Sequence, residues 1–151
     1  RTTSSAASDV YKRQPFVPGE PISAAVIIDA SGHRHILPIA RQLLSANGRF
    51  EYLGSAWDEP LARWQKPVAD LMGRLVECQP GLRGYLGLDL IGTPDGSLQT
   101  VDINPRLTTG YLAWRMRTRS NLAAAILGTD EPSWSLSAGE FRLVDLSPVC
   151  R

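Results

Sequence analysis

The chain has 151 residues, of which 43% are hydrophobic and 21% are charged, and its formal net charge at pH 7 is +1. This composition is typical of one globular domain with a substantial core. The near-neutral charge gives no electrostatic reason to expect nucleic acid or an anionic membrane as a partner. No apolar run approaches the length of a membrane span and no secretory signal pattern is present, so we expect no membrane association.

The first fourteen residues differ in composition from the rest of the chain. Residues 1–14 are rich in Ser, Thr and Ala and have no apolar periodicity, which predicts a disordered tail. Residues 4–14 also resemble translated sequencing-adapter read-through. We therefore expect this tail to be non-native and exclude it from the fold prediction.

A β-hairpin is the first predicted element. Residues 22–29 are apolar and rich in β-branched side chains, a turn follows at residues 29–32, and residues 33–39 resume as a strand. His33 and His35 share one face of that second strand. We interpret them as a partly exposed pair beside the turn, because no third metal ligand is spaced near them.

A short strand at residues 50–53 precedes a long helix at residues 60–78. The helix is predicted because apolar residues recur on one helical stripe, namely Leu61, Trp64, Val68, Leu71, Met72 and Leu75. Pro80 and Gly81 end it. The cysteines Cys78 and Cys150 have neither metal-binding spacing nor a disulfide framework, so we expect reduced thiols and a cytoplasmic location.

A second hairpin follows, with alternating strands on either side of the turn signal Asp95-Gly96. If these two residues form the loop centre, every polar side chain of interest falls on one face and the aliphatic side chains fall on the other. The predicted cross-strand pairs are Asp89 with Asp102, Gly87 with Asn104, Leu88 with Ile103, and Leu90 with Val101.

The opposed pair Asp89 and Asp102 needs a compensating group. Two like charges about 5 Å apart repel by roughly 3 kcal/mol at an effective dielectric constant near 20. Either one carboxyl group is protonated or a cation lies between them, and the neutral oxygen of Asn104 on the same face favours the cation. A small number of hard oxygen ligands suits magnesium, because this ion completes its coordination shell with oxygens of water and phosphate. The plain alternative is a surface hairpin with two solvated aspartates.

The remaining chain is predicted to contain one helix at residues 109–127, followed by a return segment of uncertain structure at residues 129–151 that is expected to be truncated. Residues 15–128 form the predicted domain. Two hairpin blocks separated by a helix indicate an α+β fold, in which an antiparallel β-sheet has its helices packed on one face.

The second hairpin contains the sequences GYLGLDL at residues 84–90 and VDINPRLTT at residues 101–109. These two sequences resemble the final metal-binding hairpin of the ATP-grasp superfamily of ATP-dependent ligases, especially its carboxylate-amine branch. Upstream, residues 16–23 resemble the segment that leaves the interdomain hinge, and residues 41–44 and 50–54 resemble the strands that follow. The resemblance implies the C-terminal subdomain of an ATP-grasp fold.

The resemblance implies a set of metal ligands. Asp89 and Asp102 would bind Mg²⁺ or Mn²⁺ at the phosphates of the cosubstrate ATP, with Asn104 as a third oxygen ligand. Family members commonly have Glu at the position of Asp102, whose shorter side chain withdraws the ligand by one methylene group. Arg106 would be catalytic, because it would contact the transferring phosphoryl group or the acyl phosphate.

Weaker substrate-binding assignments follow from the same resemblance. Thr108 and Thr109 fall where the family's acceptor-substrate loop begins. Arg41 is expected either near the ligand cleft or in a surface ion pair.

The implied function is ATP-dependent ligation that forms a C–N bond from a small-molecule carboxylate and an amine. Alternatives are a nucleotide-binding or regulatory module without turnover, and an ATP-grasp kinase or carboxylase. A whole ligase of this family has further domains ahead of the hinge. We therefore expect this chain to be a fragment that is inactive alone.

Overall fold

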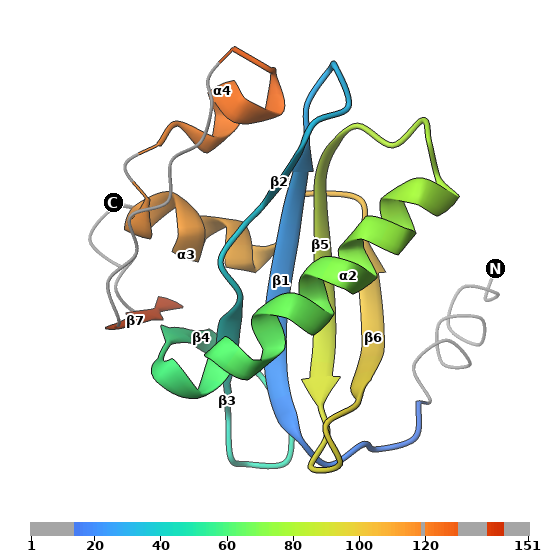
Figure 1. Ribbon diagram of the computed structural model, residues 1–151. Helices are drawn as coiled ribbons and strands as arrows, with labels where there is room; N and C mark the ends of the chain where they lie inside the picture. Colours follow the sequence, from blue (N-terminus) through green and yellow to red (C-terminus); the bar gives the residue numbers. More distant parts are fainter. Residues whose placement is uncertain (1–13, 119, 130–138, 144–151) are drawn as a thin grey trace, which may run out of the picture.

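The computed structural model describes residues 14–118, 120–129 and 139–143, and its centre is an antiparallel β-sheet. The strands lie in the order β6-β5-β1-β3-β4-β7, and β2 pairs with the far end of β1 (Figure 1). The predicted α+β class with an antiparallel sheet is confirmed. The strands are β1 (Glu20–Ile28), β2 (Arg34–Ile36), β3 (Ala40–Leu44), β4 (Tyr52–Trp57), β5 (Gly84–Gly92), β6 (Leu98–Asn104) and β7 (Gly139–Arg142).

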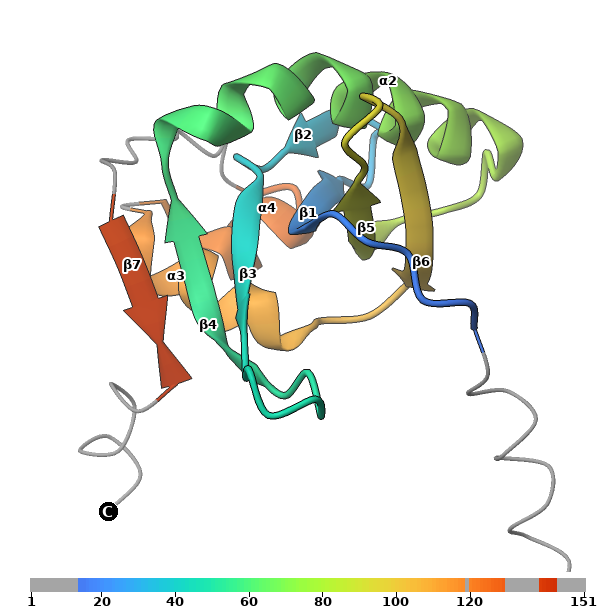
Figure 2. The same ribbon diagram turned by 90° about the horizontal axis from the view of Figure 1, so that it is seen from below.

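Helices cover both faces of this sheet, which corrects the expectation that they cover only one. Figure 2 shows α2 (Ala62–Cys78) on one side and α3 (Thr109–Arg117) and α4 (Leu122–Ile126) on the other. The reason lies in β1, where Val26 packs in the core beneath α2 and its neighbour Ile27 packs in the core beneath α3 and α4. A strand that is apolar at consecutive positions needs cover on both faces.

The long predicted helix is confirmed as α2, whose Trp64, Val68 and Met72 are buried against the sheet. It is preceded by a single 3₁₀ turn, η1 (Glu59–Leu61). No helix of the described residues has the length and apolar character needed to cross a membrane.

The strand predicted at residues 33–39 is confirmed only as the shorter β2, and β3, which corresponds to the further strand that the resemblance placed at residues 41–44, is a separate strand. The two strands pair with different parts of β1. Pro38 lies between them. Proline has no backbone N–H to donate to a strand partner, so the ladder is interrupted there. The strand predicted at residues 50–53 is β4, which starts later and runs on to Trp57.

The single helix predicted at residues 109–127 is wrong, because the chain forms α3 and α4 with a break between them. The side chain of Asn121 accepts a hydrogen bond from the backbone N–H of Ala124, which starts α4 as a new helix. In α3 the side chains of Leu112 and Met116 are exposed, whereas Trp114 is buried. The predictions for residues 1–13, 130–138 and 144–151 lie outside the described residues.

Candidate functional site

The hairpin of β5 and β6 brings the predicted acidic pair together. Asp89 lies opposite Asp102, and Gly87 lies opposite Asn104, as the alternation predicted. The predicted pairing of Leu90 with Val101 is wrong, because Leu90 pairs with Thr100 and a bulge interrupts the register beside Asp89.

The predicted register is correct at the acidic pair because two differences from the predicted hairpin compensate for each other. The loop is not the predicted two-residue turn, since Thr93 N–H donates to the Ser97 carbonyl and Gly96 N–H donates to the Thr93 carbonyl. This is a three-residue loop in which Gly96 takes a positive φ of 87°. The longer loop shifts the pairing by one residue, and the bulge shifts it back.

The three predicted metal ligands converge on one face of the hairpin. The Asn104 amide nitrogen Nδ2 lies 3.1 Å from Asp102 Oδ2 and 3.5 Å from Asp89 Oδ2. Asn104 is buried, Asp89 is half-buried and Asp102 is exposed. The two carboxylates therefore share one amide group while differing in their access to solvent.

A cavity of about 320 Å³ unites these residues with the other predicted positions. Asp89, Asp102, Asn104 and Arg106 line it together with Thr108 and Thr109 from the start of α3. Asp89 lies opposite Ser23 of β1, which is two residues before Ala25, so the cavity lies on the sheet face that α3 and α4 cover further along.

Arg41 is the predicted site residue that the cavity does not include. It lies opposite Ile22, whose side chain belongs to the core beneath α2, so Arg41 is on the other face of the sheet. There its guanidinium forms an ion pair with the carboxylate of Asp58. Of the two alternatives stated from the sequence, the ion pair is the one that the structure contains.

Gln42, the next residue of β3, lies in the site and was missed by the sequence analysis. Its amide nitrogen Nε2 donates to Asp89 Oδ1 at 2.6 Å and to the Ser23 hydroxyl at 2.8 Å. The signal that could have found it is Ser23, the one polar residue in the apolar run of β1.

The electrostatic environment of Asp89 opposes its negative charge. Burial raises the pKa of the Asp89 carboxyl group, and the nearby charge of Asp102 raises it further, while the Gln42 hydrogen bond and the Arg106 charge lower it. A cation between the two carboxylates would offset both unfavourable effects.

A second, larger cavity of about 770 Å³ adjoins the first and shares Asp89 and Gln42 with it. Its lining is mostly apolar and includes Phe16 and Phe50, whose rings stack with centroids 5.9 Å apart. The acidic pair therefore lies where a polar cavity meets an apolar one.

Comparison with known proteins identifies the family. The family model described as an ATP-grasp domain matches residues 2–110, which is most of the chain. The chain belongs to the ATP-grasp family. The resemblance and the fold expected from the sequence are thus confirmed.

Relatives of this ATP-grasp chain include ligases that are considerably longer. Tyramine–L-glutamate ligase of Methanocaldococcus jannaschii is 29% identical over 114 residues, which cover 76% of this chain and 34% of that protein. Among solved structures, the ADP complex of N5-carboxyaminoimidazole ribonucleotide synthetase superposes with a TM-score of 0.67 at 14% identity, covering 89% of this chain and 38% of its own. An L-amino acid ligase from Bacillus licheniformis gives a TM-score of 0.56 at 17% identity, and the match covers 74% of this chain and 30% of that protein. The chain thus spans about a third of the length of these relatives.

The donor atoms of the acidic pair and Asn104 fit a hard divalent cation. Asp89, Asp102 and Asn104 offer only carboxylate and amide oxygens, once the Asn104 amide is turned so that Oδ1 faces the carboxylates. Within the described part of the chain, no three His, Cys, Asp or Glu side chains are grouped so as to hold a metal ion. This small ligand set suits an ion that also takes oxygens from a nucleotide and from water.

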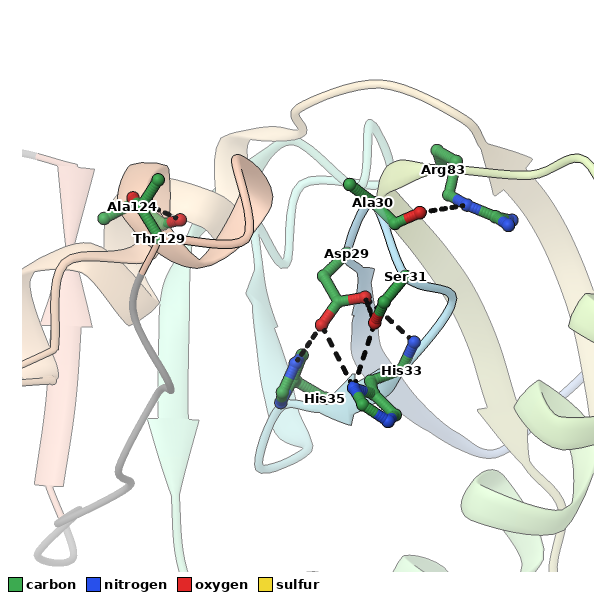
Figure 3. Close-up of polar contacts among 8 residues, drawn as sticks. All are labelled: Asp29, Ala30, Ser31, His33, His35, Arg83, Ala124 and Thr129. Atoms are coloured by element: carbon green, nitrogen blue, oxygen red, sulfur yellow. Dashed lines mark hydrogen bonds and ion pairs between the residues drawn. The ribbon is translucent and has the colours of Figure 1, made fainter.

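The histidine pair singled out in the sequence belongs to a separate polar cluster at the tip of the β1–β2 hairpin (Figure 3). His33 Nδ1 and His35 Nε2 lie 3.5 and 3.4 Å from Asp29 Oδ2, and the Ser31 hydroxyl donates to Asp29 Oδ1 at 2.6 Å. The Ser31 hydrogen bond, helped by the His33 backbone N–H, holds the pKa of Asp29 well below its usual range. These contacts stabilise the turn, in agreement with the interpretation of His33 and His35 as a pair beside the turn.

Proposed function

We propose that this chain carries the C-terminal half of the ATP site of an ATP-dependent carboxylate-amine ligase. The observation that carries the proposal is the convergence of Asp89, Asp102, Asn104 and Arg106 on one cavity. The names of two relatives, tyramine–L-glutamate ligase and L-amino acid ligase, support joining of a carboxylate to an amine.

Asp89, Asp102 and Asn104 would hold magnesium or manganese, which when bound neutralises charge on the ATP phosphates. Arg106 lies beside them, and its planar fork suits two oxygens of the phosphoryl group that is transferred. The adjoining apolar cavity has the character needed to enclose an aromatic base. Thr108 and Thr109, which line the same polar cavity, would position the acceptor.

The proposed reaction proceeds in two substitutions. A substrate carboxylate oxygen attacks the γ-phosphorus of ATP, ADP leaves, and an acyl phosphate is formed. The amine nitrogen then attacks the acyl carbon, phosphate leaves, and the nitrogen loses a proton. Neither step needs a protein nucleophile, so the chain's task is to bind, orient and neutralise charge. Cytoplasmic ATP and the free thiol of Cys78 are consistent with a cytoplasmic reaction.

The test is ADP release by the protein expressed from its complete gene, assayed with panels of carboxylic acids and amines. We expect turnover that requires one acid and one amine. Asp89→Asn and Arg106→Ala should reduce turnover at least about 100-fold while the protein remains folded. Arg49→Ala is the matched control, because the Arg49 side chain is 77% exposed in the β3–β4 loop.

Two results would contradict the proposal. Absence of ADP release with every acid and amine pair would remove the ligase assignment. Full activity of Asp89→Asn and Arg106→Ala would remove these residues from the site. The 151-residue chain by itself should not turn over ATP, because we propose that the remaining phosphate contacts and the other adenine contacts come from residues ahead of it.

A further inference from the structure

Gln42 joins two strands of the sheet to the acidic pair through a single side-chain amide. Its Nε2 group donates one N–H to Asp89 Oδ1 at 2.6 Å and the other to the Ser23 hydroxyl at 2.8 Å. Both N–H groups of the amide are thereby used. Because Ser23 lies on the central strand β1, the amide is anchored to the most buried part of the sheet.

The two oxygens of Asp89 consequently have different surroundings. Oδ1 accepts the short, charge-assisted hydrogen bond from Gln42. Oδ2 faces the neighbouring strand, where the Asn104 amide lies 3.5 Å away and also contacts Asp102. Only Oδ2 is directed toward the group of proposed ligands.

We infer that Gln42 is a positioning residue that restricts Asp89 to a single metal-binding oxygen and thereby makes the site selective for small divalent ions. This inference rests on the proposed function, because it takes Asp89 as a metal ligand. The selectivity follows from coordination chemistry. Mg²⁺ requires near-octahedral geometry with one or two carboxylates, whereas Ca²⁺ takes more oxygens and accepts both oxygens of one carboxylate.

Removal of the Gln42 donor would free Oδ1. Asp89 could then bind through both oxygens and could also rotate away from Asn104, which weakens binding of a small ion. Loss of an outer hydrogen-bond partner of this kind typically lowers metal affinity about 10- to 100-fold. The loss should be smaller for Ca²⁺, since a second Asp89 oxygen becomes available to the larger ion.

The experiment measures binding of Mn²⁺ in the presence of ADP, by electron paramagnetic resonance of free and bound Mn²⁺, in the protein expressed from its complete gene. Ca²⁺ is then titrated as a competitor. We expect Gln42→Met, which keeps the side-chain volume without the donor, to lower Mn²⁺ affinity about tenfold or more and to shift the Mn²⁺ to Ca²⁺ preference toward Ca²⁺. Ser23→Ala should shift the preference in the same direction by a smaller factor.

Gln99→Ala is the matched control, because Gln99 is an exposed glutamine on β6, and it should leave both affinities unchanged. Asp89→Asn separates the two hypotheses: if it leaves Mn²⁺ binding intact, the proposed function itself fails. If Asp89→Asn abolishes binding but Gln42→Met keeps the wild-type ion preference, or loses both ions equally, the inference about Gln42 is overturned. Should Gln42→Met not fold, an unchanged preference in folded Ser23→Ala overturns it as well.

Discussion

The acidic pair should cost the protein stability when no divalent ion is present, so Asp89→Asn should make the protein more stable. The Asp89 carboxyl group is half-buried and lies opposite the charged Asp102. Charges about 5 Å apart repel by roughly 3 kcal/mol at an effective dielectric constant near 20 and by about 1 kcal/mol in water. Because Asp102 is exposed, the lower figure is the better guide, and an asparagine amide can still hydrogen-bond to Gln42. We expect a gain of about 1 kcal/mol in the free energy of unfolding at pH 7.

The same gain should depend on pH in a defined direction. Burial and the Asp102 charge raise the pKa of Asp89 in the folded protein, so the folded state binds the proton more tightly than the unfolded state does. The stability contributed by this group is therefore full below an ordinary aspartate pKa near 4 and is lost as the pH rises through the raised pKa. The advantage of Asp89→Asn should be largest at neutral pH and should vanish near pH 4.

Urea unfolding of the wild type and Asp89→Asn, with EDTA and then with Mg²⁺ and ADP, tests this reasoning. With EDTA the variant should unfold at the higher urea concentration, and with Mg²⁺ and ADP the wild type should gain more stability than the variant. Asp70→Asn is the control, because Asp70 forms an exposed ion pair with Lys66 and its loss should change stability by no more than about 0.5 kcal/mol. If Asp89→Asn is less stable than the wild type in EDTA at pH 7, the repulsion argument is refuted.

Two further predictions concern packing and the hairpin tip. Gly92→Ala should lower the free energy of unfolding by about 1–3 kcal/mol, as measured by urea unfolding. The reason is that a Cβ atom at residue 92 would lie 2.5 Å from ring carbons of the buried Trp64. Gly81→Ala is the control and should have little effect, because a Cβ atom there would lie in open space. Asp29→Asn should lower the melting temperature at pH 7, because the Ser31 hydrogen bond stabilises the ionised carboxylate. Since the pKa of Asp29 is lowered on folding, that stabilisation is lost as the pH falls below about 4, so the melting curves of wild type and variant should converge in acid; a constant difference would contradict this.

The sequence predicted the acidic pair well because its signals are local. Alternation in β5 and β6 and the turn signal around Asp95 placed Asp89 opposite Asp102 without any information on the rest of the sheet. The longer loop and the bulge, which the sequence did not reveal, compensate for each other. The bulge beside Asp89 reverses the shift that the loop introduces before the acidic pair is reached.

The rest of the site depended on pairing between distant strands. Whether Arg41 or Gln42 enters the cavity is decided by how β3 aligns with β1, and Pro38 interrupts the chain just before that pairing begins. A shift of one residue exchanges the two side chains between faces. Local patterns cannot fix such a register. For the same reason the second helical layer was missed, since the apolar run of β1 gives no face to which the helices can be assigned.

The proposed metal site combines a fixed carboxylate with an accessible one, and this asymmetry follows from where the two strands lie. Strand β5 is inside the sheet, so Asp89 is half-buried and is held by Gln42 from β3. Among the described strands β6 is at the edge of the sheet, so Asp102 is exposed and an arriving ion would reach it without opening the core. Two carboxylates on interior strands would have a larger desolvation cost and would leave no path by which an ion could enter. Two carboxylates on edge strands would have no rigid neighbour to hold either of them in place. The pairing of an interior strand with an edge strand is therefore what would let this hairpin both orient and release an ion in the proposed metal site.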